Sequence, residues 1–484
     1  MRLKQPRVSR CRILLLSILV LTAGCSAAGV ATEPVASPAL PSAVGSQPTE
    51  GGSSAAPTAT PSPPPAIAAT PTIARAGLYV DPANKLGQAS RLSLGSNIGP
   101  WTGIPFEMQD EIADAGLTFM RFPGGEWGDD NNLVDYQIDE FIALCRKNNW
   151  EPGISVRLLG STPEQAAAVL RYTNITKGYG VRYWSIGNEP SLFATRKKID
   201  YDTERYNEEW RAFAVAMRTV DPFILLVGPD IHQFDASGGV EDAAGRPWMQ
   251  EFLKANGDAV DIVSSHRYPF PLQPSDPKPE PEQLRTNSAE WDKIIPTLRA
   301  LIRETTARDL PVAVTEVNSN WTGASGRDTT PDSRLGAIWW ADVLGRLIRE
   351  RVEIVAHFAV HGPDRQGWGL VEKYKVRPAY HVFQMYRRFG SEVVYASSDD
   401  PLVSIFAALR PDGSLTLMLI NRAPEPRSRP LSLVNFMPGP GVETWQFDGE
   451  NPPVKLSATS TAPPDSATLP PESMTLLVLV PHST

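Results

Sequence analysis

Two glutamates, each at the end of a short apolar run, are the residues of this chain best suited to chemistry. Glu189 follows the run Tyr-Trp-Ser-Ile-Gly-Asn at 183–188, and Glu316 follows Pro-Val-Ala-Val-Thr at 311–315. Short runs rich in β-branched and aromatic residues and bounded by Gly or Pro are typical of buried strands. Two carboxyl groups facing one substrate can hydrolyse a glycosidic bond, because one protonates the leaving oxygen while the other acts at the anomeric carbon. We therefore expect Glu189 and Glu316 to face each other across one site.

The predicted surroundings divide the two roles between these glutamates. Glu189 ends an apolar strand that contains Trp184, and partial desolvation there would favour its protonated form. Glu316 is expected within reach of Arg121 and the Tyr268 hydroxyl, which would hold it as a carboxylate. The hypothesis is therefore that Glu189 is the general acid/base and Glu316 the nucleophile.

These glutamates need a scaffold that brings distant strand ends together. Between residues 91 and 360, short apolar runs alternate with amphipathic helical stretches. Eight β–α units of this kind predict a parallel (β/α)8 barrel of the triosephosphate isomerase (TIM) type. A doubly wound open sheet is the alternative, although no glycine-rich phosphate loop follows the first strand. The expected strands are 91–97, 118–123, 153–158, 183–188, 223–228, 260–266, 312–317 and 354–360, and the expected helices include 105–115, 134–148, 163–173, 205–220, 289–305, 333–351 and 379–389.

Barrel active sites lie at the C-terminal ends of the strands. Glu189 would end strand four and Glu316 strand seven, so both would open on the same mouth. The catalytic barrel is predicted over residues 76–389. Short apolar runs separated by turn signals follow it and predict a small antiparallel β-sandwich over 390–484, to which a strand from 76–86 could add.

The N-terminal part of the chain has the composition of an export signal and a tether. In residues 1–24 basic residues precede the apolar run Ile13–Leu21, as in a secretory signal, and Thr22-Ala-Gly-Cys25 resembles a bacterial lipoprotein processing site. Lipidation of Cys25 would anchor the exported protein to the cell envelope; the alternative is an ordinary cleaved signal and a secreted protein. Residues 25–75 are dominated by Ala, Pro, Ser and Thr, which predicts a disordered tether.

Composition excludes several other classes of protein. The 484 residues are 42% hydrophobic and 21% charged, with a formal net charge of −8, and the first 24 residues carry only basic charge, so the remainder is still more acidic. Such a chain is not expected to bind nucleic acid, or to meet a membrane except through the lipid anchor. Only three cysteines occur, which argues against a disulfide framework. No metal and no cofactor are expected.

Several motifs resemble those of known enzymes. Gly187-Asn-Glu-Pro190 and Val314-Thr-Glu316, at two strand ends, resemble clan A of the retaining glycoside hydrolases. Arg121-Phe-Pro-Gly-Gly125 and His266-Arg-Tyr268 resemble signatures of its α-L-arabinofuranosidase, β-xylosidase and heparanase-like branches. The likeness spans about residues 78–480, although Pro-Ser-Leu after Glu189 departs from the arabinofuranosidases. It implies a carbohydrate substrate and a double displacement through two glutamates.

The resemblance also implies roles for the neighbouring residues. Asn188 would bind the sugar's 2-hydroxyl, Tyr268 would hydrogen-bond the nucleophile, Arg121 would set the nucleophile's charge, and His266 would line the sugar subsite. From its position after strand eight, Trp368 is expected to form a subsite wall by stacking on a sugar ring. Two alternative functions stay open: a catalytically silent glycan-binding lipoprotein on the same scaffold, and a retaining transglycosylase.

Overall fold

The computed structural model describes residues 76–271, 275–362, 366–456 and 465–482. Cys25 and the predicted signal and tether lie outside the described residues. Nowhere in the described part does a helix combine the length and the apolar character needed to cross a bilayer.

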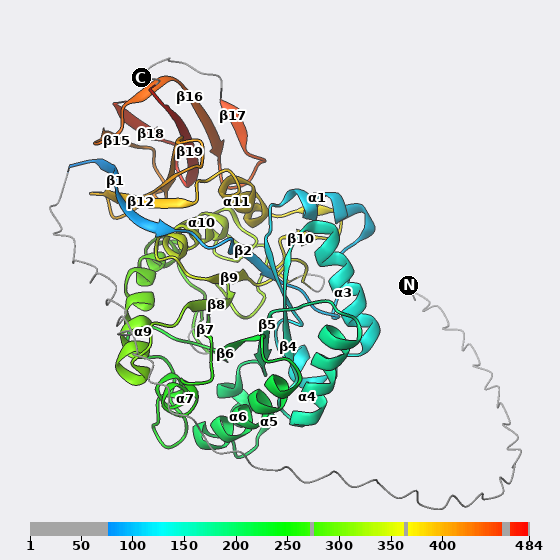
Figure 1. Cartoon of the computed structure of the whole chain (residues 1–484). Helices are drawn as coiled ribbons and strands as arrows, with labels where there is room; N and C mark the ends of the chain where they lie inside the picture. The colour runs from blue at the N-terminus through cyan, green and yellow to red at the C-terminus, as the bar shows by residue number, and fades with distance from the viewer. Residues whose placement is uncertain (1–75, 272–274, 363–365, 457–464, 483–484) are drawn as a thin grey trace, which may run out of the picture. The chain divides into compact units, whose positions relative to one another are not determined.

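Eight parallel strands close into a barrel in sequence order (Figure 1). The strands are β2 (Leu92–Asn97), β3 (Phe119–Phe122), β4 (Glu151–Val156), β5 (Tyr183–Ile186), β6 (Leu225–Ile231), β7 (Ile262–Arg267), β8 (Val312–Val317) and β9 (Ile354–His357). The predicted TIM barrel is therefore confirmed, and the open-sheet alternative is wrong because β2 pairs with both β3 and β9. The fourth and seventh barrel strands are β5 and β8.

Helices such as α3, α4, α6, α7 and α9 surround the barrel (Figure 1). The α-helices of the described residues are α1 (Gln109–Asp114), α2 (Trp127–Asp130), α3 (Asp135–Asn148), α4 (Pro163–Leu170), α5 (Phe193–Lys197), α6 (Thr203–Val220), α7 (Trp248–Asn256), α8 (Pro281–Asn287), α9 (Trp291–Thr306), α10 (Arg334–Arg349) and α11 (Pro378–Tyr386). A two-stranded ribbon, β10 (Val371–Glu372) and β11 (Lys375–Val376), lies between β9 and α11 in the chain. Helices α2, α5, α7 and α8 were not among the helices named from the sequence.

Strand alternation sorts the barrel side chains into two layers. Phe119, Tyr183 and Ile354 belong to the cluster that fills the barrel, and the rings of Phe119 and Tyr183 meet edge to face at 6.0 Å. Their neighbours, such as Trp184, point the other way and join the large cluster shared with the helices. Gly153 leaves room for this filling, since a Cβ there would lie 2.6 Å from the Phe119 ring. Apolar packing thus closes the barrel interior and leaves its C-terminal mouth to polar groups.

A second, mostly antiparallel sheet completes the fold. Its order is β17-β16-β19-β14-β13-β12-β1-β15-β18, and β1 (Leu78–Gln88) joins it from before the barrel by pairing with β12. The other strands are β12 (Glu392–Ser398), β13 (Val403–Leu409), β14 (Leu415–Asn421), β15 (Arg427–Leu433), β16 (Pro438–Phe447), β17 (Val454–Leu456), β18 (Ser466–Leu469) and β19 (Ser473–Pro481). This arrangement is consistent with the predicted β-sandwich.

Both faces of the central strands of this sheet are buried. Leu417 and Leu419 of β14 lie in the sandwich's own core, whereas Met418 and Ile420 belong to the cluster shared with the barrel helices. Burial on both faces gives β13, β14 and β19 nearly continuous apolar sequences rather than an alternating pattern.

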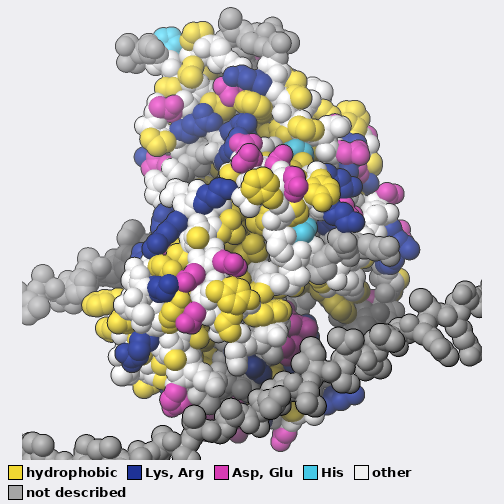
Figure 2. All heavy atoms as spheres, turned by 90° about the vertical axis from the view of Figure 1, so that its right-hand side faces the viewer, with side chains coloured by type: hydrophobic (Ala, Val, Ile, Leu, Met, Phe, Trp, Pro, Cys, Tyr) yellow, Lys and Arg dark blue, Asp and Glu magenta, His cyan; other side chains and the backbone are white. Residues whose placement is uncertain are grey.

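Charges of both signs are interspersed on the face seen in Figure 2, which is the right-hand side of Figure 1. Basic side chains there lie beside acidic and apolar ones. This differs from the basic stripe typical of nucleic-acid-binding proteins.

Candidate active site

Glu316, near the end of β8, lies in a ring of hydrogen-bond donors. Its Oε1 accepts from Arg121 Nη1 at 2.8 Å and from the Gly125 amide at 2.8 Å, and its Oε2 accepts from the Tyr268 hydroxyl at 2.7 Å. The carboxyl group is buried. Gly125 has φ of 63°, in the left-handed region that favours glycine, and this turn aims its N–H at Glu316. These three donors hold the carboxyl group in one orientation.

Arg121 ties four strand ends together. Its Nη1 also donates to Asn97 Oδ1 at 3.2 Å, and its Nη2 donates to Asn188 Oδ1 at 2.9 Å and to Asp230 Oδ2 at 3.1 Å. The side chain is 2% exposed, so these contacts are shielded from water. The guanidinium thus fixes Asn188 and the Glu316 carboxylate relative to one another.

Asp230, at the end of β6, is a buried counter-charge of Arg121. Its Oδ1 accepts from Ser264 and Thr315 hydroxyls at 2.5 Å, and its backbone carbonyl accepts from the Glu189 amide at 3.0 Å. Burial raises the pKa of Asp230, but Arg121 and the hydroxyl donors outweigh burial and lower the pKa below its usual value. Asp230 therefore balances Arg121 as a buried anion.

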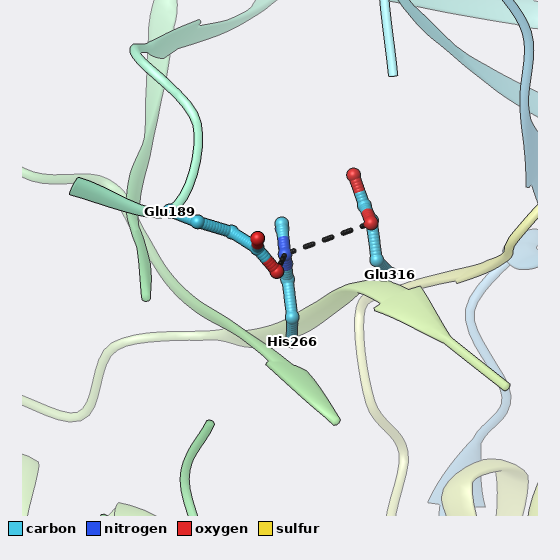
Figure 3. A group of neighbouring side chains, drawn as sticks. All are labelled: Glu189, His266 and Glu316. Carbon is cyan, nitrogen blue, oxygen red and sulfur yellow. Dashed lines mark hydrogen bonds and ion pairs between the residues drawn. The ribbon is translucent and has the colours of Figure 1, made fainter. Parts of the chain in front are cut away.

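Glu189 faces Glu316 across the mouth with His266 between them. Figure 3 shows the two carboxyl groups on either side of the His266 ring, and one oxygen of each lies within 4.8 Å of the other. His266 Nδ1 is 3.0 Å from Glu189 Oε1 and 3.7 Å from Glu316 Oε2. The other oxygen of Glu189, Oε2, pairs with Arg196 Nη2 at 2.9 Å. Both oxygens of Glu189 are therefore engaged by nitrogen donors.

The protonation expected for Glu189 from the sequence is wrong for this structure. Glu189 is buried, and burial alone would raise its pKa, but His266 and Arg196 outweigh burial and lower the pKa to about 2. His266 responds in the opposite sense, because Glu316 and Glu189 raise its pKa against the effect of burial. Trp184, expected to shield Glu189, instead lies in the outer layer and donates to the Val181 carbonyl at 2.9 Å.

Three buried nitrogens of the site residues have no hydrogen-bond partner among the described residues. They are Arg121 Nε, Asn188 Nδ2 and His266 Nε2. Buried polar atoms are normally paired, so Asn188 Nδ2 and His266 Nε2, on the residues beside Glu189, are available to a ligand. Asn188 is otherwise fixed, since Arg121 holds its side-chain oxygen and Asp129 Oδ1 accepts its backbone N–H at 3.2 Å. Burial raises the pKa of Asp129 well above its usual value.

Two residues of the site have unusual backbone conformations. Glu189 has φ of 47° and Asp230 has φ of 52°. Non-glycine residues with positive φ are uncommon, and such conformations concentrate at functional sites.

An aromatic cluster lies next to the glutamates. The Phe358 ring meets the Tyr268 ring at 6.3 Å, the Trp101 ring at 6.0 Å and the Trp368 ring at 5.4 Å. Trp368 also donates to the Asn320 carbonyl at 2.8 Å. Trp368 is thus near the site, but Phe358, which was not predicted, lies between it and Tyr268.

Glu189, His266 and Glu316 also have the donor types of a metal site, and one ligand atom of each lies within 4.8 Å of the others. Arg196 and Arg121 already pair with the two carboxylates. A divalent cation would have a guanidinium beside each carboxylate, which disfavours its binding. The absence of a metal requirement stays a prediction.

The structure brings most of the predicted site residues together. The predicted residues at this mouth are Arg121, Asn188, Glu189, His266, Tyr268 and Glu316, with Trp368 nearby. Residues that the sequence reasoning did not select include Asp129, Arg196, Asp230 and Phe358. Asp230 could have been predicted, since it follows the apolar run of a predicted strand as the two glutamates do. The sequence pattern does not indicate Arg196, because it lies in a short helix after the strand end.

Comparison with known proteins gives distant relatives by sequence. No family model matches the chain. A β-xylosidase of Geobacillus stearothermophilus is 25% identical over 274 residues, covering 50% of this chain and 47% of that enzyme. A probable α-L-arabinofuranosidase C of Aspergillus niger is 20% identical over 171 residues, covering 28% of this chain and 34% of that protein. The matches thus span about half or less of each curated relative.

Solved structures extend the likeness over most of the chain. An α-L-arabinofuranosidase from Thermotoga maritima, in complex with arabinose, aligns with a TM-score of 0.66 at 18% identity, covering 84% of this chain and 99% of that chain. The bifunctional glucanase-xylanase CelM2 from a metagenome library aligns with a TM-score of 0.63 at 19% identity, covering 84% of this chain and 99% of that chain. A family 44 xyloglucanase of Paenibacillus polymyxa aligns with a TM-score of 0.64 at 13% identity, covering 83% of this chain and 99% of that chain. The chain has their fold. The predicted resemblance to clan A glycoside hydrolases is therefore confirmed.

Proposed function

We propose that this protein is a retaining glycosidase with Glu316 as nucleophile and Glu189 as acid/base. The observation that carries the proposal is that one oxygen of each carboxylate lies within 4.8 Å of the other across the barrel mouth. Retaining enzymes hold their carboxyl groups about 5–5.5 Å apart, whereas inverting enzymes leave about 6.5–9.5 Å for a water molecule. The separation therefore favours direct attack by Glu316.

In the first step, a Glu316 oxygen attacks the anomeric carbon. The glycosidic C–O bond breaks, and its oxygen takes the proton of Glu189 as the leaving group departs. Arg121, Gly125 and Tyr268 hold the Glu316 carboxylate in the orientation for attack. Asn188 Nδ2 is free to donate to a hydroxyl of the sugar.

In the second step, the Glu189 carboxylate takes a proton from water. The water oxygen bonds to the anomeric carbon, and the ester bond to Glu316 breaks. The sugar leaves with its original anomeric configuration, and Glu189 is protonated again. An alcohol in place of water would give the transglycosylase that the sequence left open.

The substrate class that we propose is a pentoside. The two curated relatives are named for xylosides and arabinofuranosides, and one structural neighbour is named a glucanase-xylanase. A panel of aryl glycosides comprising xyloside, arabinofuranoside, glucoside, glucuronide and fucoside tests this choice. Turnover of a xyloside or arabinofuranoside is expected to exceed that of the hexosides.

Two variants test the mechanism on the best substrate of this panel. Glu316→Ala is expected to abolish turnover. Glu189→Ala should lose about 10²–10⁴-fold on substrates with poor leaving groups, yet it should still cleave dinitrophenyl glycosides. Azide should rescue Glu189→Ala by forming a glycosyl azide of retained configuration, visible by NMR. Glu251→Gln, on the outer helix α7, is the matched control and should behave as wild type.

An inverted first product, or full activity in Glu316→Ala, would contradict the mechanism. The second candidate function is glycan binding without turnover. Its supporting observation is that Arg196 and His266 engage both oxygens of Glu189. Binding of xylan or arabinan fragments, with no turnover of any glycoside in the panel, would favour it.

For location, we propose that the protein is lipid-anchored at Cys25 in a bacterial cell envelope. The support is the sequence Thr22-Ala-Gly-Cys25 after an apolar run. Labelling with radioactive palmitate in a bacterial host should mark the wild type and not Cys25→Ala. Equal release of both proteins into the medium would instead favour secretion.

A further inference from the structure

Arg196 occupies the solvent-facing side of Glu189 and has a second partner there. Its Nη2 lies 2.9 Å from Glu189 Oε2, while its Nη1 lies 2.5 Å from Glu126 Oε1. The Arg196 side chain is 33% exposed and that of Glu126 is 52% exposed, so the pair lies at the rim of the site. The acid/base therefore shares one arginine with a rim carboxylate.

This contact conflicts with the first chemical step. A general acid needs a proton and an oxygen that faces the leaving group, yet both oxygens of Glu189 are engaged. Both contacts favour the ionised form, so one of them has to weaken for Glu189 to hold a proton. His266 is fully buried and held between two carboxylates, whereas Arg196 is partly exposed and already contacts Glu126. Arg196 is the partner that can leave.

We propose that Arg196 is a positioning residue that alternates between Glu189 and Glu126 and thereby sets when Glu189 is an acid and when it is a base. This inference rests on the proposed glycosidase function. With a leaving group beside Oε2, Arg196 pairs with Glu126 alone, and Glu189 takes up one proton from solvent. After that proton has gone to the leaving oxygen, Arg196 returns to the Glu189 carboxylate, the form that activates water.

Other charged groups around Glu189 are less suited to this role. The groups that interact with it are His266 from β7, Glu316 from β8, His232 after β6, Asp129 from α2 and Arg196 from α5. Burial lowers the pKa of His232 to about 4, so it is neutral near pH 7. Glu316 and Asp129 are buried beneath the mouth. Arg196 is the member of this set that combines a permanent charge with partial exposure.

The pH profile of kcat/KM distinguishes this role from a structural one. A nearby cation lowers a carboxyl pKa, so Arg196→Gln raises that of Glu189. Because kcat/KM requires protonated Glu189, the alkaline limb should move to higher pH, by about one unit. Glu126→Gln removes the second partner of Arg196, so Arg196 stays on Glu189 and lowers the pKa of Glu189 further. The alkaline limb should then move to lower pH. Arg196→Lys should restore much of the wild-type profile.

Lys197→Gln is the matched control for these variants. Lys197 follows Arg196 on α5 and pairs with Asp130 at 2.5 Å, so its loss removes a charge from the same helix without touching Glu189. Its profile should match that of the wild type. Thermal melting shows whether each variant is folded. If Arg196→Gln does not fold, the pH profile of Glu126→Gln still tests the proposal.

A second readout needs no turnover. In protein with ¹³C-labelled glutamate carboxyls, the Glu189 signal, assigned with Glu189→Gln, should titrate at higher pH in Arg196→Gln and at lower pH in Glu126→Gln. Unchanged titration in both variants would overturn the inference. A wild type inactive on every glycoside overturns the proposed function instead, while this titration still decides whether Arg196 controls Glu189.

Discussion

Asn188 presents one end of its amide to the protein and the other to the site. Its oxygen accepts from Arg121 at 2.9 Å, and its buried nitrogen has no acceptor among the described residues. Leaving a buried donor unpaired costs about 1–3 kcal/mol. A ligand oxygen that accepts from Nδ2 would recover this cost. A sugar hydroxyl is such an oxygen, in agreement with the role implied by the clan A resemblance.

Asn188→Ala is therefore expected to lower kcat/KM by about 10²-fold on a glycoside that carries the 2-hydroxyl, the equivalent of about 2.7 kcal/mol. Wild type should lose a similar factor on the 2-deoxy glycoside. The variant should lose little more on the 2-deoxy compound, because the same hydrogen bond is already absent. If the loss from Asn188→Ala and the loss from removing the 2-hydroxyl instead multiplied, Asn188 would not bind the 2-hydroxyl. Melting temperatures of both proteins provide the stability control.

The predictable residues of the site are those that end strands. Glu189 and Glu316 could be found because a barrel brings all eight strand ends to one mouth, so polar residues after apolar runs must meet there. Arg196 could not be found in this way, because its position depends on the path of a short helix outside the strand pattern. Burial raises the pKa of Glu189, but His266 and Arg196 outweigh burial and lower it, and the strand pattern shows neither of these two contacts. The predicted acid form was therefore wrong.

Among the strands, burial determined which ones could be predicted from the sequence. Barrel strands such as β8 are buried throughout and read as apolar runs, so their positions were predicted within a few residues. By contrast, β17 (Val454–Leu456) is exposed throughout, and β18 (Ser466–Leu469) alternates between exposed and buried residues over only four positions. Neither was predicted, because so short a pattern does not differ from that of a loop.

Gly345 marks the place where the sandwich packs on helix α10. A Cβ at this position would lie 2.2 Å from the Phe406 ring and 2.4 Å from the Tyr386 hydroxyl oxygen. Gly345→Ala should therefore destabilise the protein by about 1–3 kcal/mol through overpacking, offset in part by the better helix propensity of alanine. Urea denaturation measures the change. Gly103→Ala, where a Cβ meets nothing within 4 Å, is the control and should be nearly neutral.

For the molecule as a whole, a buried charge network joins the barrel to the sandwich. Asp342 of α10 accepts from Arg346 Nε at 2.9 Å and from Ser288 Oγ at 2.6 Å, and its Oδ2 lies 3.4 Å from Arg422 Nε. Arg422, just after β14, also donates to the Arg285 carbonyl at 2.5 Å. Asp342 and Arg422 are 0% and 1% exposed, respectively. A single carboxylate thus balances the arginine that the sandwich inserts against the barrel.

Asp342→Asn is expected to cost about 3–5 kcal/mol of the free energy of unfolding at pH 7, because it leaves Arg422 buried without its counter-charge, while Arg346 keeps only its pair with Asp292. Burial raises the pKa of Asp342, but the two arginines outweigh burial and lower the pKa below its usual value. A lowered folded-state pKa stabilises the protein at pH values above the unfolded pKa of about 3.9 and loses that effect as the pH falls. The difference between wild type and variant should therefore be constant from about pH 6 to 8 and shrink below about pH 4.

Urea denaturation across this pH range measures that difference, with Asp258→Asn as the control. Asp258 pairs with Arg211 at 2.5 Å, but its side chain is 75% exposed, and exposed pairs contribute about 0–1 kcal/mol. If Asp342→Asn were as stable as this control, the network would not hold the two parts together. A large loss with a single unfolding transition would show that the barrel and the sandwich unfold together. In that case the buried carboxylate couples the stability of the sandwich to that of the catalytic mouth.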